Sequence, residues 1–139
     1  MSASQRFTLK TSCSGLLCHH IVNYKWVLFQ LSNDRDWEEI TNFEENILTH
    51  LDSPNLVIPG GKQVLRENNE YKVMVIITFD TGFVTSEEMR FVTNSPPRVF
   101  DGRDGCFVTP SEGFVFTTEF NISCSGWMDS DLPLNYEFR

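Results

Sequence analysis

The sequence lacks the features that define several broad classes of protein. It contains no apolar run long enough to cross a bilayer, and its opening residues, Met1 to Arg6, are polar and hold no apolar signal-peptide segment. Positive charge is also scarce, because 11 Lys and Arg residues face 19 Asp and Glu residues, which gives a net charge of −8. Nucleic acids and anionic lipids both require a basic face, so we expect no nucleic-acid partner and no direct membrane binding.

Motifs for cofactors, metals and catalysis are equally scarce. The sequence has no glycine-rich phosphate loop and no set of nucleophile, base and orienting carboxylate, so we predict no enzyme activity and no cofactor. Two acidic pairs, Asp101 with Asp104 and Asp129 with Asp131, each offer too few carboxylates for calcium. We interpret both pairs as turn residues and predict no metal site.

One motif does resemble a catalytic signature. Asp80-Thr81-Gly82 follows a hydrophobic run, as in aspartic proteases, where two carboxylates share a proton. A homodimer could bring two copies of Asp80 together, and this protease is the alternative function from another class. However, Phe83 stands where such enzymes need a small residue. Asp-Thr-Gly is also a favourable hairpin turn, which is the interpretation we prefer.

The residues that are abundant predict an all-β fold. Hydrophobic residues make up 40% of the chain and Phe occurs 12 times, which favours a packed core with pleated surfaces. Strict alternation places Tyr71, Val73, Val75 and Ile77 on one face of a strand, and Val84–Val92 returns as its partner. We therefore predict an immunoglobulin-like or fibronectin type III-like β-sandwich. Further expected elements are strands at 7–13, 23–30, 37–40, 56–58, 106–108 and 114–124, and one helical turn within 41–51.

Two aromatic residues carry specific predictions within this fold. Trp26 lies in a run of β-forming residues and is expected in the core. Tyr71 follows Leu65 near the start of the penultimate strand, a pattern typical of the tyrosine corner of β-sandwiches. In that motif the tyrosine hydroxyl bonds to backbone a few residues upstream.

A proline-rich linker and an internal repeat divide the chain. Asn94-Ser95-Pro96-Pro97 is a stiff segment that a central strand cannot contain, so we predict units at 1–94 and 95–139. Phe7–Gly15 resembles Phe120–Gly126, and Cys13 and Cys124 are 111 residues apart. The repeat predicts a nearly complete first sandwich followed by the opening strands of a second, truncated one, with Phe120, Ile122 and Cys124 on its inner face.

The four cysteines lie in two local pairs. Three pairings are possible, and local spacing favours Cys13 with Cys18 and Cys106 with Cys124. The alternative is a zinc site formed by Cys13, Cys18, His19 and His20, although its spacing differs from the usual ligand pairs. Asn121 begins the sequence Asn-Ile-Ser, which is an N-glycosylation site, so we predict a glycoprotein.

The C-terminal residues resemble the receptor-for-egg-jelly (REJ) module of the polycystin-1 family. The resemblance depends on Pro96-Pro97, Gly105-Cys106-Phe107-Val108-Thr109-Pro110-Ser111-Glu112-Gly113, Cys124-Ser125-Gly126-Trp127-Met128-Asp129 and Pro133-Leu134-Asn135-Tyr136-Glu137-Phe138. Residues 98–104 lengthen a stretch that is usually short in that family, so the start of the second unit is less precisely defined. Weaker similarity continues through the first unit.

The resemblance implies a function as well as a fold. Such modules are tandem fibronectin-like sandwiches in the extracellular part of membrane proteins, ahead of a calcium-signalling membrane domain. This chain is then a non-catalytic segment for ligand binding, adhesion or mechanical linkage, or else a structural spacer. Its expected partners are an extracellular protein or glycan and neighbouring ectodomain units, with the membrane reached only through other parts of the full-length protein. A binding module should expose an apolar patch on its loops, whereas a spacer should bury it.

Overall fold

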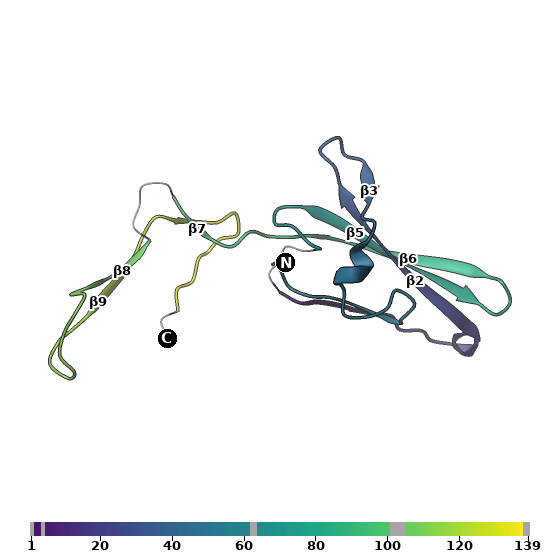
Figure 1. Cartoon of the computed structure of the whole chain (residues 1–139), viewed down its shortest axis with the longest axis horizontal. Helices are drawn as coiled ribbons and strands as arrows, with labels where there is room; N and C mark the ends of the chain where they lie inside the picture. Colours follow the sequence, from purple (N-terminus) through teal and green to yellow (C-terminus); the bar gives the residue numbers. More distant parts are fainter. Residues whose placement is uncertain (1, 4, 62–63, 101–104, 138–139) are drawn as a thin grey trace. The chain divides into compact units, whose positions relative to one another are not determined.

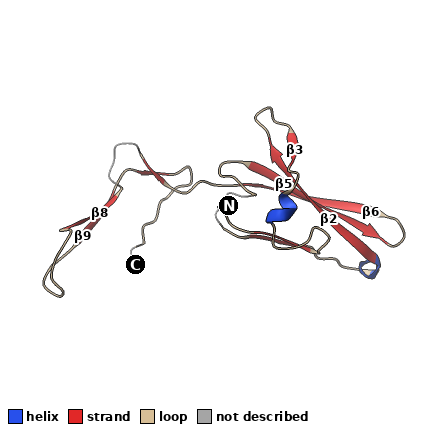
Figure 2. Ribbon diagram, viewed as in Figure 1, coloured by secondary structure: helices blue, strands red, loops and turns tan. Residues whose placement is uncertain are grey.

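The computed structural model describes residues 2–3, 5–61, 64–100 and 105–137. Its regular structure is almost entirely β, and helix occurs only as two short 3-10 segments among the described residues (Figure 2). The chain forms two compact units, Met1–Ser95 and Pro96–Arg139, which we call unit 1 and unit 2 (Figure 1). Each unit is described by itself below.

Unit 1 contains two antiparallel sheets. The larger sheet has the strand order β3-β2-β5-β6, and the smaller one pairs β1 with β4. The strands are β1 (Phe7–Lys10), β2 (Ile21–Leu31), β3 (Trp37–Glu39), β4 (Asn55–Ile58), β5 (Glu70–Phe79) and β6 (Val84–Val92). The 3-10 segments are η1 (Leu16–His20) and η2 (Phe43–Asn46).

The central strand β5 shows why this sequence forms a sheet. Its residues alternate between the core and the outer face, so that Tyr71, Val73 and Val75 are buried while Lys72 and Met74 are partly exposed. The predicted alternation is therefore confirmed. The turn after β5 is closed by a 2.9 Å hydrogen bond from the Phe79 N–H to the Phe83 carbonyl, as expected for a hairpin.

Side chains from both sheets of unit 1 share one core. Trp26 and Leu28 from β2 join Leu56 and Ile58 from β4, and all four are at most 4% exposed. The predicted burial of Trp26 is confirmed, and its indole N–H donates to the Ser53 carbonyl at 2.8 Å. The all-β prediction is also confirmed, whereas the fibronectin-like subtype stays a prediction.

The tyrosine corner is present. The backbone N–H of Arg66 donates to the Tyr71 hydroxyl at 2.7 Å, and Leu65 is buried beside it in the core cluster. Burial raises the pKa of Tyr71, and the hydrogen bond from Arg66 opposes this shift. The hydroxyl therefore stays protonated at neutral pH and accepts this bond while it remains in the core.

Unit 2 consists of two small antiparallel sheets. Strand β8 (Cys106–Thr109) pairs with β9 (Asn121–Cys124), and β7 (Arg98–Val99) pairs with β10 (Trp127–Met128). Gly105 has a φ of 61° directly before β8. An added Cβ there would lie 3.1 Å from a methyl of Val99, so glycine lets the two sheets approach closely.

Several predicted elements differ from the structure. The strand predicted at 114–124 is wrong over most of its length, because only Asn121–Cys124 is β. A tight turn replaces the rest, with the Phe114 carbonyl accepting from the Thr118 N–H at 3.1 Å. Phe120 and Ile122 are about half exposed, at 46% and 50%, so the predicted inner face is not buried within the described part of unit 2.

Smaller differences concern the ends of elements. The strand predicted at 7–13 ends at Lys10, because the chain then turns into the loop that joins Cys13 to Cys18. The helical turn expected within 41–51 is the short segment Phe43–Asn46. Asn135 and Tyr136, the counterparts of Asn23 and Tyr24 in the repeat, lie outside regular structure.

Candidate functional site

Both units carry one disulfide. The Cys13 and Cys18 sulfurs are 2.14 Å apart, and those of Cys106 and Cys124 are 2.12 Å apart across the β8–β9 pair. These are the two local pairs that the spacing favours. Because Cys13 and Cys18 are bonded to each other, neither has a free thiol that could bind zinc. No group of three or more His, Cys, Asp or Glu residues among the described positions could hold a metal ion.

Three apolar side chains protrude at one end of unit 1. Leu16 and Leu17 belong to the part of η1 that lies inside the loop closed by Cys13 and Cys18, and Phe83 belongs to the β5–β6 turn. Their exposed fractions are 89%, 60% and 60%. Figure 1 shows η1 and the β5–β6 turn at the same end of the four-stranded sheet. We call this set of residues the leucine tip.

The leucine tip is held by polar contacts as well as by the disulfide. His20 Nδ1 lies 2.8 Å from Asp80 Oδ2, and the Asp80 backbone N–H donates to the His20 carbonyl, also at 2.8 Å. Gly15, with a φ of 107°, begins the 3-10 turn in a conformation that suits glycine. The two loops are therefore joined to each other by both side chains and backbone.

The contacts of Asp80 also concern the hypothesis of a homodimeric aspartic protease. Catalytic aspartates of that class lie together in an enclosed site, where one carboxylate raises the pKa of the other. The Asp80 side chain is instead 48% exposed in a turn and contacts His20. The observed arrangement fits the hairpin interpretation of Asp80-Thr81-Gly82.

A second apolar protrusion lies in unit 2, between β8 and β9. Phe114, Val115 and Phe116 have exposed fractions of 80%, 78% and 104%. The Phe114 N–H donates to the Thr118 hydroxyl at 2.8 Å, which closes the turn, and Phe116 has a φ of 67°. A non-glycine residue in that region is strained, and such strain often occurs at functional loops.

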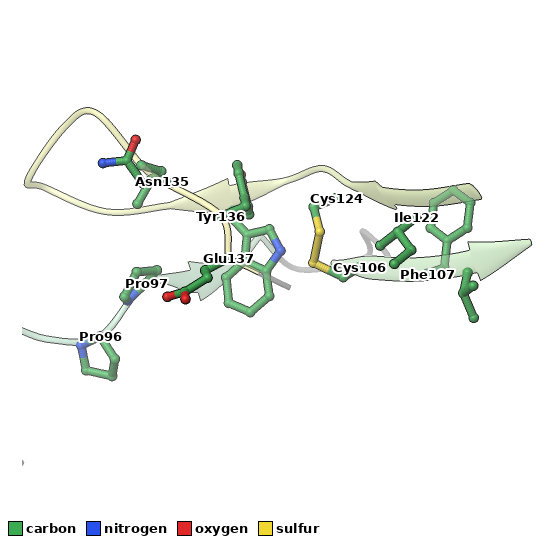
Figure 3. Close-up of a pocket in the computed structure, with 12 residues that line it drawn as sticks. Pro96, Pro97, Cys106, Phe107, Ile122, Cys124, Asn135, Tyr136 and Glu137 are labelled. Carbon is green, nitrogen blue, oxygen red and sulfur yellow. A yellow bond between two sulfur atoms is a disulfide. The ribbon is translucent and has the colours of Figure 1, made fainter. Parts of the chain in front are cut away.

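Unit 2 also contains an apolar pocket of about 680 Å³ (Figure 3). Phe107, Ile122 and Tyr136 contribute apolar lining, and Figure 3 shows the Cys106–Cys124 disulfide among them. The indole N–H of Trp127, which also lines the pocket, is buried and has no hydrogen-bond partner in the part of the chain that the structure describes. The pocket thus has mainly apolar walls, to which Asn135 and Glu137 add polar groups.

The remaining predicted residues are placed as follows. Asn121 is exposed at the start of β9, opposite Thr109, so its amide is accessible. The Asp129 carboxylate accepts from the Asp131 N–H at 3.0 Å, which is the geometry of an ordinary turn. Asp101 and Asp104 lie outside the described residues.

The sequence prediction missed both apolar protrusions. The adjacent leucines within the Cys13–Cys18 spacing were an available signal, since a loop of that length cannot bury them itself. Phe114-Val115-Phe116 contains strong β-formers and was interpreted as strand. Only the backbone conformation of residues 114–118 shows that these side chains belong to a turn.

Fold and surfaces together define an all-β module with one disulfide in each unit and apolar residues on its loops. None of the helices in the described ranges is long and apolar enough to cross a membrane. The chain belongs to the REJ domain family, which matches residues 1–139. It is similar to the Polycystin family receptor for egg jelly of Mus musculus, with 27% identity over 137 residues. That match covers 99% of this chain but only 6% of the mouse protein. No solved structure matches.

Proposed function

We propose that this chain is a non-catalytic extracellular module of a polycystin-like membrane receptor, and that it binds a protein ligand through the leucine tip. Family membership supports the receptor assignment, and the mouse relative is named as a receptor. The observation that carries the binding role is the exposure of Leu16, Leu17 and Phe83 on adjoining loops. A calcium-signalling membrane domain elsewhere in the full-length protein would transmit the response.

The leucine tip favours binding over a spacer role. A spacer needs no exposed apolar loops, and exposing them lowers solubility. Here the disulfide and the His20–Asp80 pair fix the loops in place. A fixed loop loses little conformational entropy when it binds, so the same contacts give higher affinity.

The chemistry of the tip favours a protein over a glycan. A glycan presents mainly hydroxyl groups, which need hydrogen-bond partners when they are buried. The side chains of Leu16, Leu17 and Phe83 offer none. An apolar cleft on a protein surface would accept them without leaving a polar group unsatisfied.

Unit 2 is best explained as the opening strands of a second sandwich. Its β8–β9 pair has an apolar pocket on one side, and Ile122 and Phe107 there are only half covered. Two paired strands with an apolar face require a facing layer to form a core. This proposal accounts for the pocket without a small-molecule ligand.

The binding proposal is tested with the dye-labelled chain, secreted from eukaryotic cells, on intact epithelial cells. We expect saturable binding that the unlabelled chain competes. The double variant Leu16→Ser/Leu17→Ser should bind at least about tenfold more weakly, equivalent to about 1.4 kcal/mol. Leu48→Ser is the matched control, since Leu48 is 58% exposed on another loop of unit 1. Equal binding by both variants would show that the leucine tip is not the binding site, and the absence of saturable binding by the wild-type chain would support the spacer role.

The extracellular placement is tested separately by peptide mapping of the secreted chain under non-reducing conditions. We expect peptides linked through Cys13–Cys18 and Cys106–Cys124. Extracellular proteins retain such bonds, whereas the cytosol keeps thiols reduced. Four free thiols in folded, secreted protein would contradict the placement and reopen the zinc alternative.

A further inference from the structure

The disulfide of unit 1 lies in a part of the chain that is outside the core. No residue from 11 to 20 is buried, and η1 contributes no buried side chain. Leu16 and Leu17 of the leucine tip lie between Cys13 and Cys18. Breaking this bond would therefore leave the core cluster of unit 1 intact.

The loop that this disulfide closes has few other contacts. Within it, the backbone N–H of Cys18 donates to the Gly15 carbonyl at 3.4 Å. Beyond the loop, the chain is next bonded to the rest of unit 1 at Thr11 on one side and at His20 on the other. Loss of the disulfide would therefore release residues 12–19 between these two points.

The disulfide of unit 2 is held differently. Cys106 and Cys124 lie directly opposite each other in the β8–β9 ladder. A hydrogen bond of 2.8 Å from the Ser125 N–H to the Gly105 carbonyl continues the pairing just beyond them. These backbone contacts keep the two sulfurs adjacent after reduction, which favours re-formation of the bond.

We propose that Cys13–Cys18 is a reducible disulfide, and that its cleavage by an extracellular dithiol reductant releases the leucine tip and lowers its affinity for ligand. This inference rests on the proposed function, because it concerns the same apolar residues. The intact bond holds Leu16 and Leu17 in one arrangement, whereas the released segment 12–19 must lose conformational entropy before it binds.

The reduction is an ordinary thiol–disulfide exchange. A thiolate of the dithiol attacks the Cys13 sulfur, because Cys13 is exposed and Cys18 is only partly exposed. A mixed disulfide forms on Cys13, and Cys18 leaves as a thiolate that takes a proton from water. The second thiol of the reductant then displaces Cys13. Two electrons have passed to the protein sulfurs, and the dithiol has become a disulfide.

The reduction step is tested on the secreted full chain in dithiothreitol redox buffers. The freed thiols are blocked with iodoacetamide, and mass spectrometry of the peptides distinguishes the two pairs. We expect Cys13–Cys18 to be half reduced at a ratio of reduced to oxidised dithiothreitol at least about tenfold lower than Cys106–Cys124. Comparable ratios for the two bonds, or earlier reduction in unit 2, would overturn the proposal.

The release step is tested by NMR relaxation on the selectively reduced chain. We expect the backbone order parameters of Leu16 and Leu17 to fall from about 0.85, typical of rigid backbone, to below about 0.6. Those of Leu28 and Val73 in the core should not change. Unchanged values at Leu16 and Leu17 would show that the bond does not control the leucine tip, and lower values in the core would show that it supports the fold instead.

The binding step uses the dye-labelled chain on intact epithelial cells. The variant Cys13→Ser/Cys18→Ser reproduces the open loop without a reductant, and it should bind at least about tenfold more weakly than wild type. Cys106→Ser/Cys124→Ser is the matched control and should bind as tightly as wild type, because it leaves the leucine tip closed. The core order parameters verify that unit 1 is folded in both variants.

The outcomes separate this proposal from the proposed function. Absence of binding by the oxidised wild-type chain would overturn the binding role and, with it, this regulation. Binding by wild type together with equal binding by Cys13→Ser/Cys18→Ser would leave the binding role standing and overturn the regulation alone.

Discussion

The backbone N–H of Arg66 is bonded to the hydroxyl of Tyr71, five residues later in the chain, at 2.7 Å. Thr93 completes this arrangement, because its buried hydroxyl donates to the Arg66 carbonyl and accepts from the Asn69 N–H. The segment that leads into β5 is thus tied to the start of β5 and to the end of β6. Removing a single polar atom from this network should therefore destabilise the start of β5 and the end of β6.

Replacing Tyr71 by Phe should destabilise unit 1 by about 0.5–1.5 kcal/mol, because the partly buried hydrogen bond from the Arg66 N–H is lost. Thermal unfolding followed by circular dichroism measures the effect, and about 1 kcal/mol lowers the melting temperature of a domain of this size by about 4–8 °C. Tyr136→Phe is the control, since Tyr136 is 48% exposed in unit 2. Equal melting temperatures for Tyr71→Phe and wild type would contradict the structural role of the corner.

The stability of unit 1 should fall at strongly alkaline pH, because Tyr71 is buried in the folded chain. Burial raises the pKa of Tyr71 in the folded chain above its ordinary value of 10.0. In the unfolded chain Tyr71 releases its proton at a lower pH than in the folded chain. The contribution of Tyr71 to the free energy of unfolding is therefore complete below pH 10 and is lost as the pH rises through the folded pKa. Urea unfolding at a series of pH values measures this slope. In Tyr71→Phe the part of the slope due to this residue should disappear.

Removing the disulfide of unit 2 should affect that unit alone. The variant Cys106→Ser/Cys124→Ser opens a loop whose ends are 18 residues apart, which corresponds to about 3 kcal/mol of chain entropy. We expect faster amide exchange in β8 and β9, with exchange in β5 unchanged. The matched variant Cys13→Ser/Cys18→Ser opens a loop with a separation of only 5 and should cost less. Faster exchange throughout unit 1 in the first variant would show that the units do not fold independently.

A glycan should be present on Asn121 in protein secreted from eukaryotic cells. The residue is exposed at the start of β9, and the acceptor sequence is intact. Intact-mass measurement before and after enzymatic deglycosylation detects the modification. Asn121→Gln and Ser123→Ala should each remove it. An unmodified mass in the wild-type chain would show that the site is not used.

Local patterns in the sequence predicted much of unit 1. The alternation from Tyr71 to Ile77, the Asp80–Gly82 turn and the buried Trp26 all depend on neighbouring residues, whose periodicity is visible directly. The tyrosine corner was also predictable, because it requires only a leucine and a tyrosine at a short separation. The family resemblance added the module type, which the fold alone does not specify.

Other features depend on specific contacts that the composition and periodicity of the sequence do not reveal. Phe114–Phe116 has the composition of a strand, and the turn there arises from a hydrogen bond between Phe114 and Thr118. The leucine tip requires His20 and Asp80, 60 residues apart, to meet. In each case a specific contact decides the structure that the residue pattern leaves open.

Near the ends of unit 1, Ser2 and Asn94 are neighbours in an isolated parallel bridge. Both segments run in the same direction there, and a force that separates these two points loads this bridge first. Ala3 adds to the resistance, because it is buried and its carbonyl accepts from the Gly61 N–H at 3.0 Å. Tension applied between Ser2 and Asn94 would therefore meet this parallel contact before it reached the β5–β6 hairpin.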